Sequence, residues 1–466
     1  MTKRRRERDS MVRTLAAILS VIALILGCAA VCCAADVPLY GDANGDGVID
    51  MKDVLTVRKY VAELSVTLNL ATADANRDGA INTKDVLWLR KTIATENSVN
   101  TAPIATPTFA PTAMNGEMRG VWFAYYEVAA LLKSTPAASK AAIDTAFDTC
   151  KADGINAVFF HVRAYSDAYY SSKLFPQVAA VKNLLKQGFD PLAYAVQAAH
   201  SRQMTLHAWL NPYRVGDGKN AVCADTFVFD GKTYYNPASE AVKQLLLNGI
   251  GEILDNYDVD GIHLDDYFYP SGVPATAQSF DTGYTAKSGS LAVWRRAQVT
   301  DFVKRACALT HKKKPNATFG ISPAGNIETD RDTLYADVEA WLKTPGCVDY
   351  LCPQLYYGFQ NSAAPFSATL RRWAALPRAD GVKLYAGLAV YKAGLLSDTW
   401  AGAGKTEWSA GGDLLARQVK DARAADGVDG VALFSYRYLT GEAFDDSCDS
   451  AVVQNELKNL KRELLA

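Results

Sequence analysis

The sequence carries almost no excess of charge of either sign. Its 466 residues include 49 lysines and arginines and 50 aspartates and glutamates, so the formal net charge is -1. A nucleic-acid-binding protein normally shows a basic surplus on one domain, and here the basic cluster is confined to the first 13 residues. The composition therefore argues against nucleic acid as a partner.

Cysteines are few, and their spacing does not suit a metal site. No CxxC pair or Cys/His ligand pattern occurs, which argues against zinc, and no cofactor is expected in the large C-terminal domain. Buried thiols are the simplest expectation, and one or two disulfides are the alternative for a protein outside the cytosol. The cysteines beyond residue 35 are Cys150, Cys223, Cys307, Cys347, Cys352 and Cys448.

The hydrophobic run at residues 15–27 is too short to cross a membrane comfortably as a mature helix. Basic residues precede it and small residues follow it, which predicts a signal peptide over residues 1–35 and a secreted chain without a transmembrane helix. Alternatively, Ile25-Leu26-Gly27-Cys28 resembles a lipoprotein box, and a lipid on Cys28 would hold the protein at the cell surface. No oligomerisation signal is visible, so a monomer is expected.

Two similar loops follow the predicted signal peptide. Asp42-Ala-Asn-Gly-Asp-Gly-Val-Ile-Asp-Met-Lys-Asp53 is matched 32 residues later by Asp74-Ala-Asn-Arg-Asp-Gly-Ala-Ile-Asn-Thr-Lys-Asp85. Each loop places side-chain oxygens at positions 1, 3, 5, 9 and 12, a backbone carbonyl at position 7 and a turn-forming glycine, Gly47 or Gly79, at position 6, as calcium requires. The predicted ligands are Asp42, Asn44, Asp46, Val48, Asp50, Asp53, Asp74, Asn76, Asp78, Ala80, Asn82 and Asp85.

The aspartate at position 12 and the matching helices after both loops closely resemble the type I dockerin family over residues 40–95. The resemblance implies a small all-α domain, assigned to residues 36–96, with two structural calcium ions. It also implies a cohesin domain on a scaffold protein as partner. Residues 97–116 are rich in Thr, Pro and Ala and are predicted to form an extended linker.

From residue 117 to 466, short apolar runs alternate with amphipathic stretches. The expected strands are 119–125, 155–163, 205–212, 260–267, 317–322, 349–356, 383–390 and 430–436. Eight such units predict an α/β fold closed into a (β/α)₈ TIM barrel. The alternative, a doubly wound open sheet, normally has fewer strands, and no Gly-rich phosphate loop follows the first strand here.

Polar and aromatic residues gather where the predicted strands end, which is where TIM barrels place their active sites. Such a cleft suits a polysaccharide substrate. The predicted substrate-binding residues are His161, Arg163, Trp209, Asn211, Tyr213, Arg214, His263, Tyr267, Gln354 and Tyr356.

Several of these segments resemble the glycosyl hydrolase-like family 10. The matching motifs are Met118-Arg-Gly-Val-Trp122, Asp260-Gly-Ile-His-Leu-Asp-Asp-Tyr-Phe-Tyr-Pro270, Gly320-Ile-Ser-Pro323 and Pro353-Gln-Leu-Tyr356. The resemblance implies a TIM-barrel glycosidase, in a family whose members include enzymes acting on peptidoglycan glycan strands without peptides.

Glycoside hydrolysis requires two carboxyl groups, one to protonate the leaving oxygen and one to act as nucleophile or base. We expect Asp265 to be the nucleophile or base and either Asp266 or Glu328 to be the proton donor. Asp265 and Asp266 should point to opposite faces of the predicted strand unless the backbone turns there. The predicted function is a secreted glycoside hydrolase acting on peptide-free peptidoglycan; the alternatives are a plant-polysaccharide enzyme and a non-catalytic glycan-binding barrel.

Overall fold

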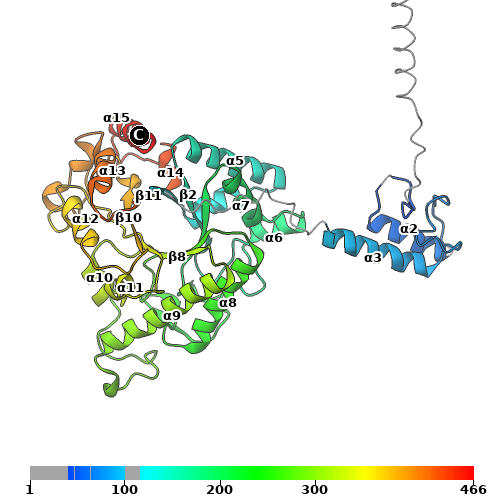
Figure 1. The fold of residues 1–466 in the computed structure, drawn as a ribbon, viewed down its shortest axis with the longest axis horizontal. Coiled ribbons are helices and arrows are strands. Elements are labelled where there is room, and N and C mark those ends of the chain that lie inside the picture. The colour runs from blue at the N-terminus through cyan, green and yellow to red at the C-terminus, as the bar shows by residue number, and fades with distance from the viewer. Residues whose placement is uncertain (1–39, 47, 63, 100–115) are drawn as a thin grey trace, which may run out of the picture. The chain divides into compact units, whose positions relative to one another are not determined.

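The fold was obtained as a computed structural model that describes residues 40–46, 48–62, 64–99 and 116–466 (Figure 1). The described residues form two compact units, one within Met1–Thr108 and the other within Phe109–Ala466. The predicted signal peptide, Cys28, Gly47 and nearly all of the predicted linker lie outside the described residues.

The larger unit is a closed barrel of eight parallel strands, which confirms the predicted TIM-barrel class. In order around the barrel, the strands are β1 (Met118–Phe123), β11 (Gly430–Phe434), β10 (Lys383–Ala389), β9 (Tyr350–Leu351), β8 (Thr318–Ile321), β7 (Gly261–Leu264), β3 (Thr205–Leu210) and β2 (Ala157–Arg163). Each contains part of one of the eight predicted apolar runs.

Helices surround the strands (Figure 1). They are α4 (Tyr125–Leu131), α5 (Pro136–Ala152), α6 (Ala179–Lys186), α7 (Pro191–Ser201), α8 (Glu240–Asn256), α9 (Leu291–Lys313), α10 (Ile327–Asp332), α11 (Val338–Lys343), α12 (Phe366–Ala374), α13 (Leu414–Ala424), α14 (Tyr436–Leu439) and α15 (Ser450–Leu465). Short 3₁₀ helices span Ala286–Ser288, Val390–Lys392, Gly402–Gly404 and Glu407–Ser409.

Local sequence explains where the helices begin. The Thr135 side chain accepts a hydrogen bond from the backbone N–H of Ala138, and Pro136 occupies the first turn of α5. Asp190 and Pro191 start α7 in the same way. Side-chain oxygens at these positions satisfy N–H groups that have no partner within the helix, and proline needs none.

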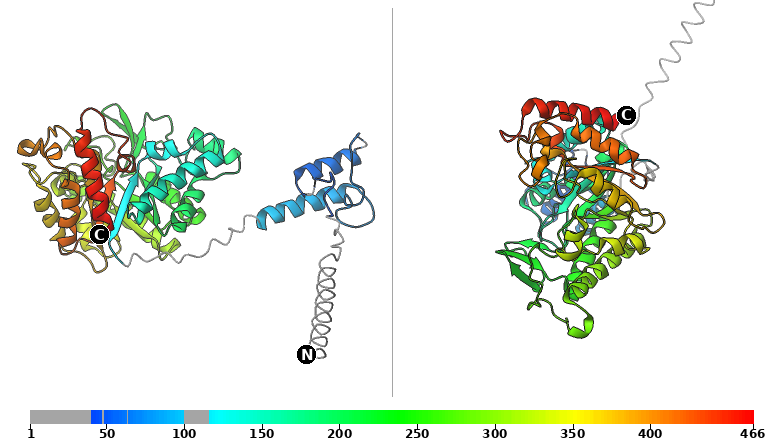
Figure 2. Two further views of the ribbon diagram at one scale, coloured as in Figure 1. Left: turned by 90° about the horizontal axis from the view of Figure 1, so that it is seen from above. Right: turned by 90° about the vertical axis from the view of Figure 1, so that its left-hand side faces the viewer.

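A three-stranded antiparallel sheet inserted after β3 was not predicted. It comprises β4 (Arg214–Gly216), β5 (Thr226–Phe229) and β6 (Lys232–Tyr235), in the order β4-β6-β5. Figure 2 draws short green arrows that stand out from the barrel at this point. Asp230 and Gly231, both with positive φ, form the two-residue turn between β5 and β6. An Asp-Gly turn between alternating apolar residues is a hairpin signal that the sequence does contain.

The smaller unit consists of the repeated loops and two helices, α2 (Met51–Val61) and α3 (Thr83–Val99). Its core is a small apolar cluster that takes residues from both copies, including Val54, Val57 and Leu89. Each copy therefore depends on the other to bury its apolar side chains.

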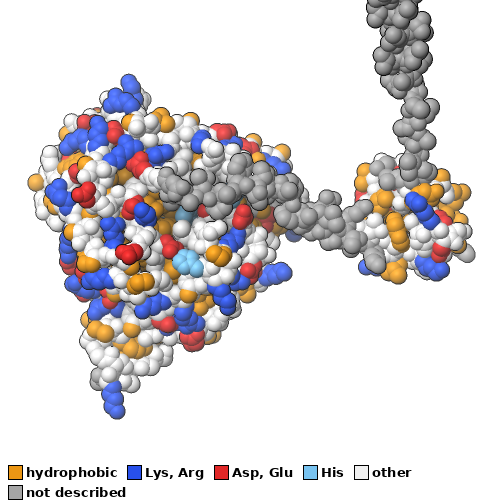
Figure 3. Space-filling model, in the orientation of Figure 1, with side chains coloured by type: hydrophobic (Ala, Val, Ile, Leu, Met, Phe, Trp, Pro, Cys, Tyr) orange, Lys and Arg blue, Asp and Glu red, His pale blue; other side chains and the backbone are white. Residues whose placement is uncertain are grey.

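The surface of the barrel shown in Figure 3 intersperses basic and acidic side chains, in keeping with the balanced composition. Within the described ranges, no helix has both the length and the apolar character that crossing a bilayer demands.

Candidate active site

A cavity of about 280 Å³ opens at the C-terminal ends of the barrel strands. It gathers nine of the thirteen predicted catalytic and substrate-binding residues, which come from four strands, β2, β3, β7 and β9, or from the segments that follow them. Those nine are His161, Trp209, Asn211, Arg214, Asp265, Asp266, Tyr267, Gln354 and Tyr356.

Asp265 and Asp266 follow β7 directly and both line the cavity. The strand ends at Leu264, so the alternation of side chains along a strand no longer separates the two carboxyl groups. Asp265 is buried, and its oxygens accept hydrogen bonds from the Trp209 indole at 3.3 Å and from the Tyr267 backbone N–H at 3.2 Å. Asp266 is half-buried.

Burial raises the pKa of both carboxyl groups. The pKa of Asp265 rises well above its usual value, first because of burial and second because of the adjacent charge of Asp266. The pKa of Asp266 rises because of burial, opposed by hydrogen bonding to Gln354 and by the charge of Arg214. Two neighbouring carboxyl groups in a poorly solvated site are not readily ionised together, so the pair is suited to hold a single proton.

Aromatic side chains hold the polar groups of the cavity in place. The His161 ring stacks on the Trp209 ring with centroids 3.6 Å apart, so one face of the indole is covered. The Trp209 indole N–H points to both Asn211 Oδ1, at 3.1 Å, and Asp265. Trp209 thus orients the carboxyl group of Asp265 in addition to lining the cavity.

Glu328 does not line this cavity. It lies in the first turn of α10, exposed to solvent, where the Arg372 guanidinium binds its carboxylate. Hydrogen bonding to Arg372 lowers the pKa of Glu328, which keeps it ionised. A solvated, paired carboxylate outside the cavity is not placed to protonate a leaving group there.

The other three predicted residues that do not line the cavity are buried elsewhere in the barrel. Arg163 donates to the backbone carbonyl of Pro212 at 3.4 Å and lies over the ring of Phe175. Tyr213 packs on Phe302 in the main core.

His263 lies inside the barrel, fully buried, where burial holds its pKa well below the usual value. Its Nε2 accepts from the Trp122 indole at 3.0 Å, so the proton of the neutral ring is on Nδ1, which faces the Tyr350 hydroxyl at 2.9 Å. His263 therefore positions Trp122, which does line the cavity.

Several cavity residues were absent from the predicted site. Tyr125 and Tyr126 follow β1, so the same strand-end rule that selected the other residues would have found them. The full set of additional lining residues is Trp122, Ala124, Tyr125, Tyr126, Ser322, Tyr391 and Phe434.

Glu127, a further carboxylate near the strand ends, has a structural role. It is buried and accepts hydrogen bonds from the Ala124 and Arg437 backbone N–H groups and from the Ser435 hydroxyl, at 2.6 to 2.7 Å. These three donors join the segments after β1 and β11, which fixes one wall of the cavity.

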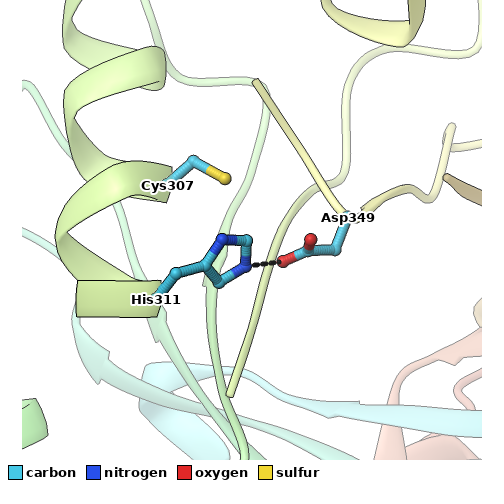
Figure 4. A group of neighbouring side chains, drawn as sticks. All are labelled: Cys307, His311 and Asp349. Atoms are coloured by element: carbon cyan, nitrogen blue, oxygen red, sulfur yellow. Dashed lines mark hydrogen bonds and ion pairs between the residues drawn. The ribbon is translucent and has the colours of Figure 1, made fainter. Parts of the chain in front are cut away.

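At the opposite end of the barrel, Cys307, His311 and Asp349 bring three potential metal ligands within 4.8 Å of one another (Figure 4). Asp349 accepts from His311 Nε2 at 2.8 Å and from the Phe319 backbone N–H at 2.6 Å. The same arrangement, without a cysteine, recurs at Asp260. Its carboxylate accepts from His200 Nε2 at 2.8 Å and from the Leu206 backbone N–H at 2.7 Å. The repetition explains the His–Asp pair as a structural contact that ties a helix to the start of a strand.

The predicted calcium ligands form two nearly identical turns in the smaller unit. Asp42 accepts from the backbone N–H groups of Gly45 and Asp46, and Asp74 accepts from those of Asp78 and Gly79. The position-12 residues Asp53 and Asp85 are completely buried.

The chemistry of this donor set fits calcium. Burial raises the pKa of Asp53, and the charge of Asp42 in the same loop adds to the shift. Hard oxygen donors carried on one short loop match what calcium prefers. The cation would compensate their mutual repulsion.

Comparison with known proteins agrees with this architecture. The family model described as "Glycosyl hydrolase-like 10" matches residues 117–222 and 219–401, more than half of the chain, and the type I dockerin model matches residues 40–94. Type I dockerin domains generally bind calcium and imply a cohesin partner, and they typically belong to extracellular enzymes.

Among curated proteins, glycosyl hydrolase YngK of Bacillus subtilis (strain 168) is 29% identical over 335 residues, 63% of this chain. The chain spans 64% of the length of YngK. Glycosyl hydrolase DigH of Escherichia coli (strain K12) is 28% identical over 400 residues, 73% of this chain and 88% of DigH.

Two solved structures are also similar. The PgaB (BpsB) glycoside hydrolase domain of Bordetella bronchiseptica covers 70% of this chain and 96% of its own, with a TM-score of 0.48 and 12% identity. The endo-1,4-beta-mannanase of Rhizomucor miehei covers 75% and 95%, with a TM-score of 0.47 and 14% identity. Because the family model covers more than half of the chain, the chain belongs to the glycosyl hydrolase-like 10 family and is a glycoside hydrolase that carries a type I dockerin domain.

Proposed function

We propose that this enzyme hydrolyses the glycan strands of bacterial peptidoglycan after their peptides have been removed. The observation that carries the proposal of hydrolysis is the pair Asp265 and Asp266 in one aromatic-lined cavity at the strand ends. The resemblance of the barrel to the glycosyl hydrolase-like family 10 supports the bacterial glycan as substrate.

We assign the proton donor to Asp265 and the nucleophile or base to Asp266, the reverse of the roles expected from the sequence. The more deeply buried Asp265 is the group on which a proton is best retained, while hydrogen bonding to Gln354 favours the ionised form of Asp266. The charge of Arg214 lowers the pKa of both carboxyl groups. Asp265 gives its proton to the glycosidic oxygen as the bond to the anomeric carbon breaks. Asp266 attacks that carbon or takes a proton from the water that does so, and water supplies the hydroxyl group of the new reducing end.

We further propose that the chain is secreted or held at the cell surface and that its dockerin domain binds two calcium ions and a cohesin on a scaffold. Leu55 and Leu87 occupy equivalent positions in the two copies and are 50% and 68% exposed. Met51 and Trp88 are exposed nearby in the sequence. Apolar side chains concentrated on so small a unit support a protein partner.

Product release by the full-length, calcium-loaded protein tests the function. The substrates are peptide-free peptidoglycan glycan, intact peptidoglycan and a panel of plant polysaccharides, with Asp266→Asn as the inactive control. New reducing ends from the peptide-free glycan alone, absent with the variant, would support the proposal.

The alternatives predict other outcomes in the same assay. Cleavage of plant polysaccharides alone would move the enzyme to biomass degradation, which the dockerin domain favours. Binding of a glycan without cleavage of any would indicate a glycan-binding barrel and would contradict the assigned roles of Asp265 and Asp266.

A further inference from the structure

A second cavity, of about 440 Å³, adjoins the catalytic one and takes no part in the steps assigned above. It lies between the segment after β2, which includes Tyr165, and the inserted β4-β6-β5 sheet. Arg214 lines both cavities, so the two spaces lie on either side of its side chain. A glycan strand in the catalytic cavity would therefore extend a neighbouring sugar into the second one.

Two cations face this second cavity without a carboxylate partner. The Arg214 guanidinium lies over the rings of Tyr165 and Tyr267, at 4.7 and 4.2 Å, and donates to the Tyr165 hydroxyl at 3.3 Å. Lys232, at the start of β6, is exposed. Neither side chain forms an ion pair with any residue that the structure describes.

The acidic residues of the cavity do not cancel these charges. Asp217 is paired with Lys219 at 3.0 Å, and both are exposed. Asp167 is half-buried, accepts from the Tyr165 backbone N–H at 3.1 Å, and has its pKa raised by burial. When Lys219 is counted with its partner Asp217, the three cations Arg214, Lys219 and Lys232 outnumber the carboxyl groups of Asp167 and Asp217 by one.

We propose that the second cavity is a sugar subsite that binds the carboxylate of an acidic sugar, with Arg214 and Lys232 as its ligands. The planar guanidinium presents paired N–H donors that match the two carboxylate oxygens, and its stacking on two rings holds it flat. The inference deepens the proposed function and rests on it, because the subsite would place the acidic sugar next to the cleaved bond.

Both candidate classes of substrate include glycans with such a group. In peptide-free peptidoglycan the lactyl carboxylate of muramic acid is free, whereas an attached peptide converts it to an uncharged amide. In substituted plant polysaccharides the carboxylate belongs to a uronic acid. The subsite would thus make removal of the peptide a condition for binding if the first glycan is the substrate.

The test measures dissociation constants by titration calorimetry with the full-length, calcium-loaded Asp265→Asn variant. Oligosaccharides of peptide-free peptidoglycan are compared with the same oligosaccharides after reduction of their carboxyl groups to alcohols. Glucuronic-acid-substituted xylan is compared with its reduced form in the same way. We expect the acidic form of one glycan to bind at least about tenfold more tightly than its reduced form, and that glycan identifies the source.

Arg214→Gln and Lys232→Gln, each added to this variant, should reduce or abolish the difference between acidic and reduced glycan. Lys186→Gln is the matched control, because Lys186 is an exposed cation on α6 that does not line the cavity and pairs with none of its acidic residues. Equal binding of acidic and reduced forms of both glycans, or an equal effect of Lys186→Gln, would overturn the subsite.

Cleavage by the wild-type protein, measured in parallel, separates this inference from the proposed function. Equal cleavage of acidic and reduced peptidoglycan glycan would preserve the function and reject the subsite. Carboxylate-dependent binding without cleavage of any glycan would preserve the subsite and reject the function.

Discussion

Aspartates at the two ends of the barrel lie in contrasting surroundings. At the N-terminal ends of the strands, Asp260 and Asp349 each accept two hydrogen bonds of 2.6 to 2.8 Å, one from a backbone N–H and one from a histidine ring nitrogen. At the C-terminal ends, Asp265 accepts two longer bonds and lies beside a second carboxyl group, Asp266. The same residue type therefore has its hydrogen-bonding capacity filled at one end of the barrel, which suits a structural role, and left partly open at the other, which suits the proposed catalytic role.

The largest expected effect concerns the C-terminal end. Asp265→Asn and Asp266→Asn should each lower kcat by about 10²- to 10⁴-fold, because each removes a group that moves a proton or attacks the anomeric carbon. Asp255→Asn on α8, whose carboxylate pairs with Lys313 at the surface, is the control and should keep near wild-type activity. Activity within a few-fold of wild type in either active-site variant would contradict the catalytic roles assigned to Asp265 and Asp266.

Calcium removal extends the comparison to carboxylates that a cation is expected to compensate. Excess chelator should unfold the dockerin domain, because the crowded carboxylates of each loop then repel one another, while the barrel keeps its own unfolding transition. Circular dichroism and calorimetry of the full-length protein would measure both transitions. An unchanged spectrum in chelator would show that the loops do not require the ion.

At the N-terminal end, Asp260→Ala should destabilise the barrel by about 1 to 3 kcal/mol, because the Leu206 N–H and the His200 ring lose their acceptor. Hydrogen bonding to Asp260 raises the pKa of His200. The charged pair therefore contributes most below the unfolded-state pKa of histidine, and its contribution disappears as pH rises through the folded-state pKa.

Denaturant unfolding at several pH values checks this. The decrease in the free energy of unfolding caused by Asp260→Ala should be greater at pH 6 than at pH 9. A loss that does not change with pH would assign the whole effect to the backbone hydrogen bond.

The smallest effect has the opposite sign. Asp265→Asn should stabilise the barrel at alkaline and neutral pH, because the wild-type carboxyl group has a raised pKa and its ionisation opposes folding. The difference should shrink as pH falls and disappear below the unfolded-state pKa of aspartate. In a domain of this size, each kcal/mol added to the free energy of unfolding should raise Tm by on the order of 2 °C. Thermal unfolding at pH 5 and pH 8 would measure it, and a variant less stable than wild type at pH 8 would contradict it.

Periodicity and turn residues made the barrel predictable. Short apolar runs separated by amphipathic stretches exclude most other folds, because only strands buried on both faces carry such runs at this spacing. The inserted β4-β6-β5 sheet was missed although Asp230-Gly231 marks its hairpin, because an expectation of simple strand–helix alternation leaves no place for an antiparallel insertion.

For the candidate site, strand-end position selected nine residues that do line one cavity. It also selected Glu328, Arg163, Tyr213 and His263, which lie elsewhere. A position just after a strand in the sequence does not determine whether the chain then turns toward the cavity or away from it. Glu328 shows this most clearly, since a helix carries it out to Arg372.

The sequence by itself determined the two kinds of domain, the duplicated oxygen-rich loops and the strand ends from which an active site would be built. These depend on local spacing, which the linear order of residues records directly. Only the tertiary structure decided that β7 ends before Asp265, that Trp209 and Gln354 reach the two carboxyl groups, and that Arg214 lines two cavities. Burial, pKa and ion pairing depend on contacts between residues far apart in the chain, and the order of residues does not encode those contacts one position at a time.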